Sequence, residues 1–277
     1  MEPVRKVLWF VESYSRTQIT LEDISQACKV SPFHLTRTFA ATMGISLMRY
    51  VRGRRLTEAA RSLAQGADDI LRVALNAGYG SHEAFTRAFR DQFGLTPEKV
   101  RDQGHLNNLS LVEAILMTPT PTADIAPARF ETKDSVQYAG LVERYACEAP
   151  QGIAGQWQRF SPYLGRLSGQ VGKVAYGVVY NFDSDSNFDY MCGVEHQKTA
   201  PVPEGLQALQ VPRQKYAVFV HPGHVAGIRG TLSAIWSKWL PESGHQAAEA
   251  PTLERYGPEF NPVTGMGGFE IWLPIQE

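Results

Sequence analysis

A threonine followed by an arginine occurs twice in the first third of the chain, in the same local setting. Thr36-Arg37 and Thr86-Arg87 lie fifty residues apart, and each pair comes five residues after a serine. A short hydroxyl beside a long guanidinium, near the start of a helix, suits hydrogen bonding to base edges and phosphates in a DNA groove. The flanking residues repeat at the same interval, as Ser31/Ser81, Phe39/Phe89 and Gly44/Gly94.

Each copy predicts two helices joined by a short break, which is a helix-turn-helix unit. The serines are suitable N-caps for the second helix of each unit. The predicted helices span residues 21–27 and 32–43 in the first copy, and residues 70–77 and 81–93 in the second. The packed stripes are Leu35 and Phe39, then Phe85, Phe89 and Phe93, and the free faces carry Phe33, Thr36 and Arg37, then His82, Glu83, Thr86 and Arg87. The free faces predict DNA contacts, and the alternative is a solvated helix surface.

Residues 46–64 predict one long helix between the two copies. Such a spacer suits two recognition helices that enter successive major grooves, about 34 Å apart. It carries arginines that we interpret as phosphate contacts or as solvated charges, namely Arg49, Arg52, Arg54, Arg55 and Arg61.

The pattern changes after a Pro/Thr linker at residues 118–122, which a short helix over residues 109–117 precedes. Short strands are predicted at residues 136–145, 174–180, 188–194, 216–221 and 269–274, and helices at 153–167 and 225–239. Strand, helix, strand, strand can be traced twice in this order. We therefore expect an all-α domain over residues 1–108, a linker over 109–127 and an α+β domain over 128–277.

The last strand places a carboxylate beside an indole. Alternation puts Phe269, Ile271 and Leu273 toward the helices, and Glu270 and Trp272 on the opposite face. A carboxylate and a π face together suit a small cationic ligand. Further candidates for this ligand site are Glu195, Tyr145 and Trp157, with core packing as the alternative for the tryptophan.

Composition indicates a two-domain globular chain with oppositely charged halves. Residues 1–105 hold 15 Lys and Arg against 11 Asp and Glu, a net charge of +4, and the remainder holds 12 against 17. The basic half suits DNA, whose phosphates make affinity salt-dependent. We expect a cytoplasmic protein without a membrane partner, since no stretch approaches about 20 apolar residues and no secretion signal is evident. The spacing of Cys28, Cys147 and Cys192 predicts neither a metal site nor a thiol switch, and we expect no cofactor.

Residues 4–102 resemble the DNA-binding domain of the AraC/XylS transcription factors, in the subgroup that carries this domain at the N-terminus. The resemblance rests on Arg55-Leu56, Ile70, Ala74, Gly78-Tyr79, Phe85, Arg87, Phe89, Gly94, Thr96-Pro97 and Val100-Arg101. It implies contacts with promoter DNA through the two free faces, an activator, and RNA polymerase as a partner. The family has Trp at the position of Phe33 and Gln-Gln at His82-Glu83, so the operator sequence does not carry over.

The second half, from about residue 129, resembles the GyrI-like effector-binding fold. The resemblance rests on residues 215–219, His221, Gly223, 239–241, Gly244, 254–257 and above all 270–274. It implies a site where aromatic side chains and a carboxylate hold amphipathic, often cationic, small molecules.

These patterns together predict a bacterial transcription regulator that senses a small effector. One alternative is a small-molecule hydrolase fused to a DNA-binding domain, because some GyrI-like proteins resemble hydrolases. It would have to rest on Glu270 and its neighbours, since the sequence shows no Ser-His-Asp order, metal-ligand spacing or phosphate loop. A third possibility is an architectural DNA protein with a protein-binding second domain.

Overall fold

A computed structural model describes residues 2–14, 18–67, 69–115, 125–147 and 152–276. The chain divides into two compact units, which are described one at a time. The predicted Pro/Thr linker at residues 118–122 lies outside the described residues, and the predicted domain limits stay predictions. Within the described residues, no helix combines the length and the apolar composition that crossing a bilayer requires.

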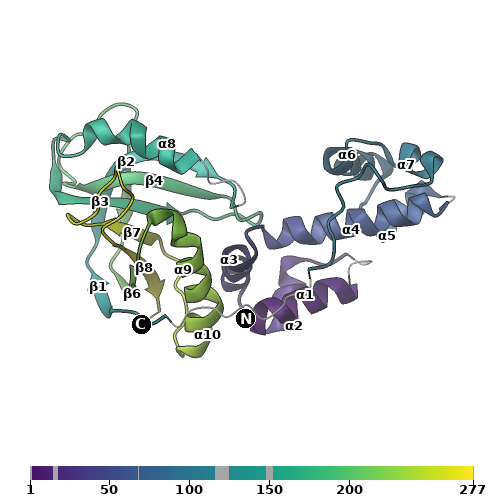
Figure 1. The fold of residues 1–277 in the computed structure, drawn as a ribbon, viewed down its shortest axis with the longest axis horizontal. Coiled ribbons are helices and arrows are strands. Elements are labelled where there is room, and N and C mark those ends of the chain that lie inside the picture. Colours follow the sequence, from purple (N-terminus) through teal and green to yellow (C-terminus); the bar gives the residue numbers. More distant parts are fainter. Residues whose placement is uncertain (1, 15–17, 68, 116–124, 148–151, 277) are drawn as a thin grey trace. The chain divides into compact units, whose positions relative to one another are not determined.

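The first compact unit is helical and contains both predicted helix-turn-helix units. The first helix-turn-helix unit pairs α2 with α3, and the second pairs α5 with α6. Helix α4 runs between them, with α3 and α6 at its opposite ends (Figure 1). The helices are α1 (Glu2–Tyr14), α2 (Leu21–Cys28), α3 (Pro32–Met43), α4 (Leu47–Ala64), α5 (Ile70–Asn76), α6 (His82–Phe93) and α7 (Pro97–Gln103).

Capping residues explain where these helices begin. Thr20 and Asp23 form a reciprocal capping box at α2, and Ser46 Oγ accepts a hydrogen bond from the Arg49 N–H at α4. Ser81 caps α6 in the same way, with Ala84 N–H as the donor. These short polar side chains satisfy backbone donors that lack a partner within the helix.

The predicted apolar stripes form the cores of the two helix-turn-helix units. Leu35 and Phe39 are buried in the first unit. In the second helix-turn-helix unit, the Phe89 ring centroid lies 5.4 Å from that of Phe85 and 4.8 Å from that of Phe93. Each stripe therefore turns the opposite side of its helix outward.

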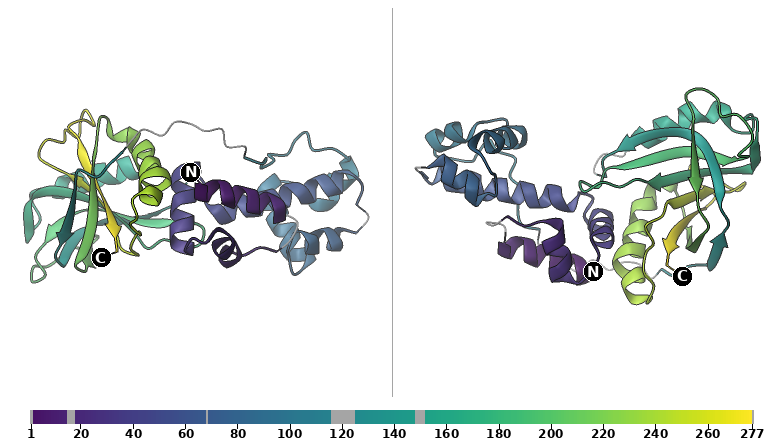
Figure 2. Two further views of the ribbon diagram at one scale, coloured as in Figure 1. Left: turned by 90° about the horizontal axis from the view of Figure 1, so that it is seen from below. Right: turned by 180° about the vertical axis from the view of Figure 1, so that it is seen from behind.

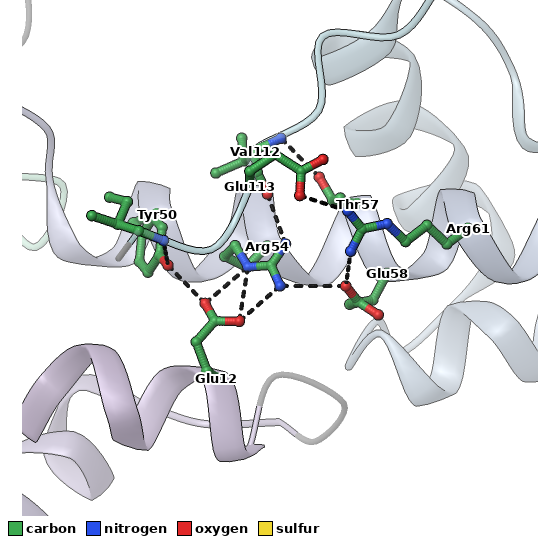
Figure 3. Close-up of polar contacts among 9 residues, drawn as sticks. Glu12, Tyr50, Arg54, Thr57, Glu58, Arg61, Val112 and Glu113 are labelled. Carbon is green, nitrogen blue, oxygen red and sulfur yellow. Dashed lines mark hydrogen bonds and ion pairs between the residues drawn. The ribbon is translucent and has the colours of Figure 1, made fainter. Parts of the chain in front are cut away.

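The predicted helix over residues 109–117 is wrong for its described part. Residues 109–115 form no helix or strand. Their backbone instead bonds to side chains of α4, which satisfies polar groups that a helix would have paired internally (Figure 3).

The second unit is an α+β domain, as predicted. Its strands are β1 (Arg129–Lys133), β2 (Val136–Tyr145), β3 (Gln170–Tyr180), β4 (Phe188–His196), β5 (Gln207–Val211), β6 (Gln214–His221), β7 (Thr252–Tyr256) and β8 (Phe269–Ile275). Its helices and helical turns are α8 (Ile153–Phe160), η2 (Ser161–Tyr163), η3 (Val225–Gly227), α9 (Ile228–Ala234), η4 (Ile235–Trp239) and α10 (Leu240–Glu242).

All eight strands form one antiparallel sheet in the order β1-β6-β8-β7-β3-β4-β2-β5. The expected duplication is confirmed as β2-α8-β3-β4 and β6-α9-β7-β8, and the two copies meet where β7 pairs with β3. The prediction located five of these strands. The repeat implied a further strand before β8, but β7 was not located in the sequence. The edge strands β1 and β5 were missed, because they are short and mostly exposed and show no clear buried alternation. Strand β1 pairs with β6, the first strand of the second copy, and β5 pairs with β2, the first strand of the first copy.

Cross-strand pairing assigns the residues to two faces of the sheet. The inner face contains the row Met191, Val178, Leu253, Trp272 and Val218. The helix face contains the row Cys192, Gly177, Glu254, Ile271 and Phe219. The sheet curls around its inner face (Figure 2). The curl brings Lys133 of β1 within ion-pair distance of Glu195 of β4, although several strands separate β1 from β4 in the sheet.

Candidate functional site

Helix α3 presents part of the predicted free face of the first helix-turn-helix unit. Phe33 and Arg37 are partly exposed on it. The expectation that Thr36 also lies on this face is wrong, because Thr36 is only 8% exposed. Its hydroxyl lies 3.0 Å from the carbonyl oxygens of both Pro32 and Phe33, so it bonds to its own helix. A threonine hydroxyl often bonds one turn back, and the sequence period alone did not reveal this.

Helix α6 presents the corresponding face of the second helix-turn-helix unit. Glu83 and Arg87 are exposed, while Thr86 and His82 are partly buried. His82 Nε2 lies 3.1 Å from a carboxylate oxygen of Glu98 in α7, which holds the imidazole at the start of α6. Glu83 and Arg87 face away from the phenylalanine stripe, whereas His82 and Thr86 lie beside it and are partly buried. The expectation of one free face therefore holds for Glu83 and Arg87 only.

The inner face of the sheet holds Glu270 and Trp272, as the alternation predicted. Glu270 accepts hydrogen bonds of 2.7 and 3.0 Å from Arg129, one of 3.3 Å from Arg255, and one of 2.9 Å from the Trp272 indole. Burial alone would raise the pKa of Glu270, but the bonds from Arg129 and Trp272 and the two guanidinium charges outweigh it and lower that pKa. The negative charge of Glu270 is therefore already neutralised within the protein.

The second predicted carboxylate of the inner face, Glu195, is neutralised in the same way. Lys133 Nζ lies 2.7 Å from Glu195 Oε1, and the Tyr176 hydroxyl donates to the same oxygen at 2.6 Å. The Lys133 ammonium also lies 5.5 Å from the Tyr176 ring and 5.7 Å from the Trp272 ring. Carboxylates and rings that already hold cations of the chain are poor receptors for an external cation.

The helix face carries a carboxylate that the sequence did not single out as a ligand residue. Glu254 of β7 accepts hydrogen bonds from the hydroxyls of Tyr190, at 2.6 Å, and Tyr256, at 2.9 Å. No described Lys, Arg or His side chain forms an ion pair with it. Burial raises the pKa of Glu254, and the two hydroxyl donors offset this only in part. A partly exposed carboxylate in an apolar setting is thus left without a counter-ion.

Aromatic side chains from both copies of the fold surround this carboxylate. Trp157 of α8 donates its indole N–H to the Tyr190 hydroxyl at 3.2 Å, and its ring lies 5.1 Å from that of Tyr256. The Tyr256 ring in turn lies 4.9 Å from Phe260 and 5.1 Å from Phe269. A half-buried carboxylate ringed by aromatic side chains has the composition of a site for organic cations.

The five predicted ligand residues therefore divide between the two faces. Trp157 and Tyr145 lie on the helix face, where the Tyr145 ring is 6.4 Å from that of Tyr190, whereas Glu270, Trp272 and Glu195 lie on the inner face. The missed residues had a signal, because Glu254 and Tyr256 are two residues apart and so share one face of a strand. Among the described residues, no cluster of His, Cys, Asp or Glu is arranged to hold a metal ion.

Comparison with known proteins finds matches in both halves. A family model described as a GyrI-like small molecule binding domain matches residues 127–276, and one described as a helix-turn-helix domain matches residues 24–103. The transcriptional regulator BrlR of Pseudomonas aeruginosa is 33% identical over 151 residues, which cover 53% of this chain and 55% of BrlR. The transcriptional regulator Rob of Salmonella typhimurium is 22% identical over 272 residues, 95% of this chain and 92% of Rob.

A solved structure also resembles the second half. It is SAV2435 bound to tetraphenylphosphonium, with a TM-score of 0.43 and 22% identity over 53% of this chain and 93% of SAV2435. The chain thus spans about half of BrlR and most of Rob.

Gly177 allows the Tyr190–Glu254 contact to form, and its replacement tests this geometry. A methyl group at Gly177 would lie 2.2 Å from Tyr190 Oη and 2.7 Å from Glu254 Oε2. We expect Gly177→Ala to lower the free energy of unfolding by about 1 to 3 kcal/mol in urea titrations, because the site is overpacked. Tyr190→Phe in the same background removes the nearest atom and should recover part of the loss. A Gly177→Ala chain as stable as the wild type would contradict this arrangement.

Proposed function

This chain belongs to the GyrI-like small molecule binding family and carries an AraC-type helix-turn-helix domain, and from this premise we propose that it is a transcription regulator that senses an organic cation. The effector binds at Glu254 on the helix face, and α3 and α6 contact promoter DNA. The observation that carries the effector site is the half-buried Glu254 carboxylate, which accepts hydrogen bonds from two tyrosines and has no counter-ion among the described residues.

The chemistry of this carboxylate defines the class of effector. A desolvated negative charge is costly, so a cation that reaches it gains more than it would at an exposed carboxylate. The rings of Trp157, Tyr190 and Tyr256 offer π faces and apolar area rather than the oxygen ligands that Mg²⁺ or Ca²⁺ prefer. A bulky, lipophilic organic cation fits both properties.

On the DNA side, the proposed contacts come from the outward faces of α3 and α6. Phe33 and Arg37 act in the first unit, and the second unit uses Arg87, supported by His82, Glu83 and Thr86. Thr36 takes part through the helix that its hydroxyl bond supports rather than through an exposed hydroxyl. The relatives named as transcriptional regulators support this role, and we propose activation with RNA polymerase as the partner.

We propose no catalytic residue, although hydrolysis remained the alternative from the sequence. A raised pKa would suit Glu254 as a general base, but both tyrosines donate to the one oxygen that they share. This arrangement suits retention of a charge rather than proton transfer. Calorimetry separates the two roles, since binding saturates whereas turnover gives a steady heat as long as substrate lasts.

The effector site is tested with tetraphenylphosphonium, a lipophilic cation that has no titrating group of its own. We expect Glu254→Gln to weaken its binding by about tenfold or more, or ~1.4 kcal/mol, because the amide removes the charge and keeps the shape. Glu270→Gln is the matched control on the inner face and should stay within about twofold of the wild type. Isothermal titration calorimetry gives both constants, and the opposite ranking of the two variants would move the site to the inner face.

The pH dependence of the same binding reports on the ionisation of Glu254. Only the ionised carboxylate attracts the cation, and its pKa is raised. Affinity should therefore rise as the pH rises through that pKa and then level off, with the midpoint above that of an ordinary glutamate. Glu254→Gln should show no such rise. Equal pH profiles for both proteins would exclude the carboxylate as the receptor.

Arginine substitutions test the DNA contacts. We expect Arg37→Ala and Arg87→Ala each to weaken binding to a duplex selected from a random-sequence library, by about 1 to 3 kcal/mol for an arginine that reads a base. Arg72→Ala, an exposed arginine of α5, is the control and should change affinity little. Fluorescence anisotropy provides the constants. Protection of a single groove segment in footprints of the monomer would contradict reading by both helices.

A further inference from the structure

The segment that follows α7 runs along α4 as an extended strap, defined here as residues 109–115. Its backbone forms three hydrogen bonds with side chains of α4. The Val112 N–H donates to Thr57 Oγ1 at 3.0 Å, Arg54 donates to the Val112 carbonyl at 2.8 Å, and the Ile115 N–H donates to Tyr50 Oη at 3.2 Å. Figure 3 shows the strap meeting successive turns of the helix.

Side-chain packing fits the strap to the surface of α4. Gly53 faces the strap, and a methyl group at this position would lie 2.7 Å from Val112 Cγ2. Leu109 and Leu111 pack against the buried core of the second helix-turn-helix unit. Arg61 of α4 forms an ion pair of 2.6 Å with Glu113. The strap thus occupies a surface of α4 that is shaped to receive it.

Arg54 shows why docking matters to the rest of the unit. It was expected to be a phosphate contact or a solvated charge, which is wrong, because it is 4% exposed. Its guanidinium donates to both oxygens of Glu12 in α1, at 2.9 and 2.7 Å, and to the Val112 carbonyl. A buried guanidinium is tolerated only when its donors are paired, so release of the strap leaves this cation incompletely satisfied.

Tyr50 links the strap to the first recognition helix. Its hydroxyl accepts from the Ile115 N–H and donates to Glu12 Oε1 at 2.7 Å, and its ring lies 5.8 Å from that of Phe39 in α3. Helix α1, which carries Glu12, packs against α2. Tyr50 and Arg54 are therefore shared between the strap and the contacts that hold the first helix-turn-helix unit on α4.

We propose that the strap is a releasable clamp: docked on α4, it holds the two helix-turn-helix units in the arrangement that binds DNA, and its release lowers DNA affinity. In the sequence, the strap is followed by the segment that leads to β1. The inference concerns the DNA-binding unit without effector and so does not depend on the Glu254 site.

The test uses two full-length variants that release the strap without altering a residue of either recognition helix. Gly53→Ala introduces a steric clash with Val112, while alanine itself favours the helix. Thr57→Val removes the acceptor of the Val112 N–H at constant shape. Hydrogen exchange of the strap peptide should speed up by about tenfold in each. The dissociation constant for a duplex selected by the wild type from a random library should rise by about fivefold.

Two further chains complete the design. Val112→Ala in the Gly53→Ala background deletes the clashing methyl groups and should return exchange and DNA affinity to within about twofold of the wild type. Gly230→Ala in α9, where an added methyl group meets nothing within 4 Å, should leave both unchanged. Faster exchange with unchanged DNA affinity would overturn the proposal. So would unchanged exchange in both releasing variants, or a Val112→Ala rescue of exchange without a rescue of affinity.

Discussion

A charge removed from water must find a partner, and this constraint shapes both halves of the molecule. Arg54 meets it within the chain, through Glu12, Glu58 and the Val112 carbonyl, and so ties three separate segments together. Glu254 has two tyrosine hydroxyls but no cation among the described residues. The Arg54 contacts stabilise the helical half. The Glu254 carboxylate keeps an uncompensated negative charge, which a cationic ligand can neutralise.

Duplication gives the two halves different kinds of site. In the helical half, each copy carries its own recognition helix, and α4 keeps the copies apart. In the α+β half, the copies join into one sheet, and Gly177 of the first copy pairs directly opposite Glu254 of the second. The first copy also supplies Trp157 and Tyr190. The proposed effector site therefore requires both copies, whereas each proposed DNA-contacting face lies within one.

Local patterns were sufficient for much of the fold. The serine caps and the apolar stripes define α3 and α6, because capping and helical periodicity act over a few residues. The repeat of strand, helix, strand, strand was visible for the same reason. Short range also explains the failures. The edge strands are too short and too exposed to generate a clear alternation, and the Thr36 hydroxyl found an acceptor in its own helix.

The conformation of the strap and the position of the unpaired carboxylate depend on residues that are distant in the sequence. Residues 109–115 have a composition compatible with a helix, yet the α4 side chains that bond their backbone lie 55 to 65 residues earlier. Likewise, Glu270 and Glu254 are both glutamates beside aromatic residues in strands. By itself, the sequence determined the duplicated helix-turn-helix units, the α+β repeat and the presence of carboxylates among aromatic residues. Only the tertiary structure decided which carboxylate is neutralised, because the arginines that approach Glu270 come from β1 and β7, and the pairing of strands, not their order in the chain, brings them there.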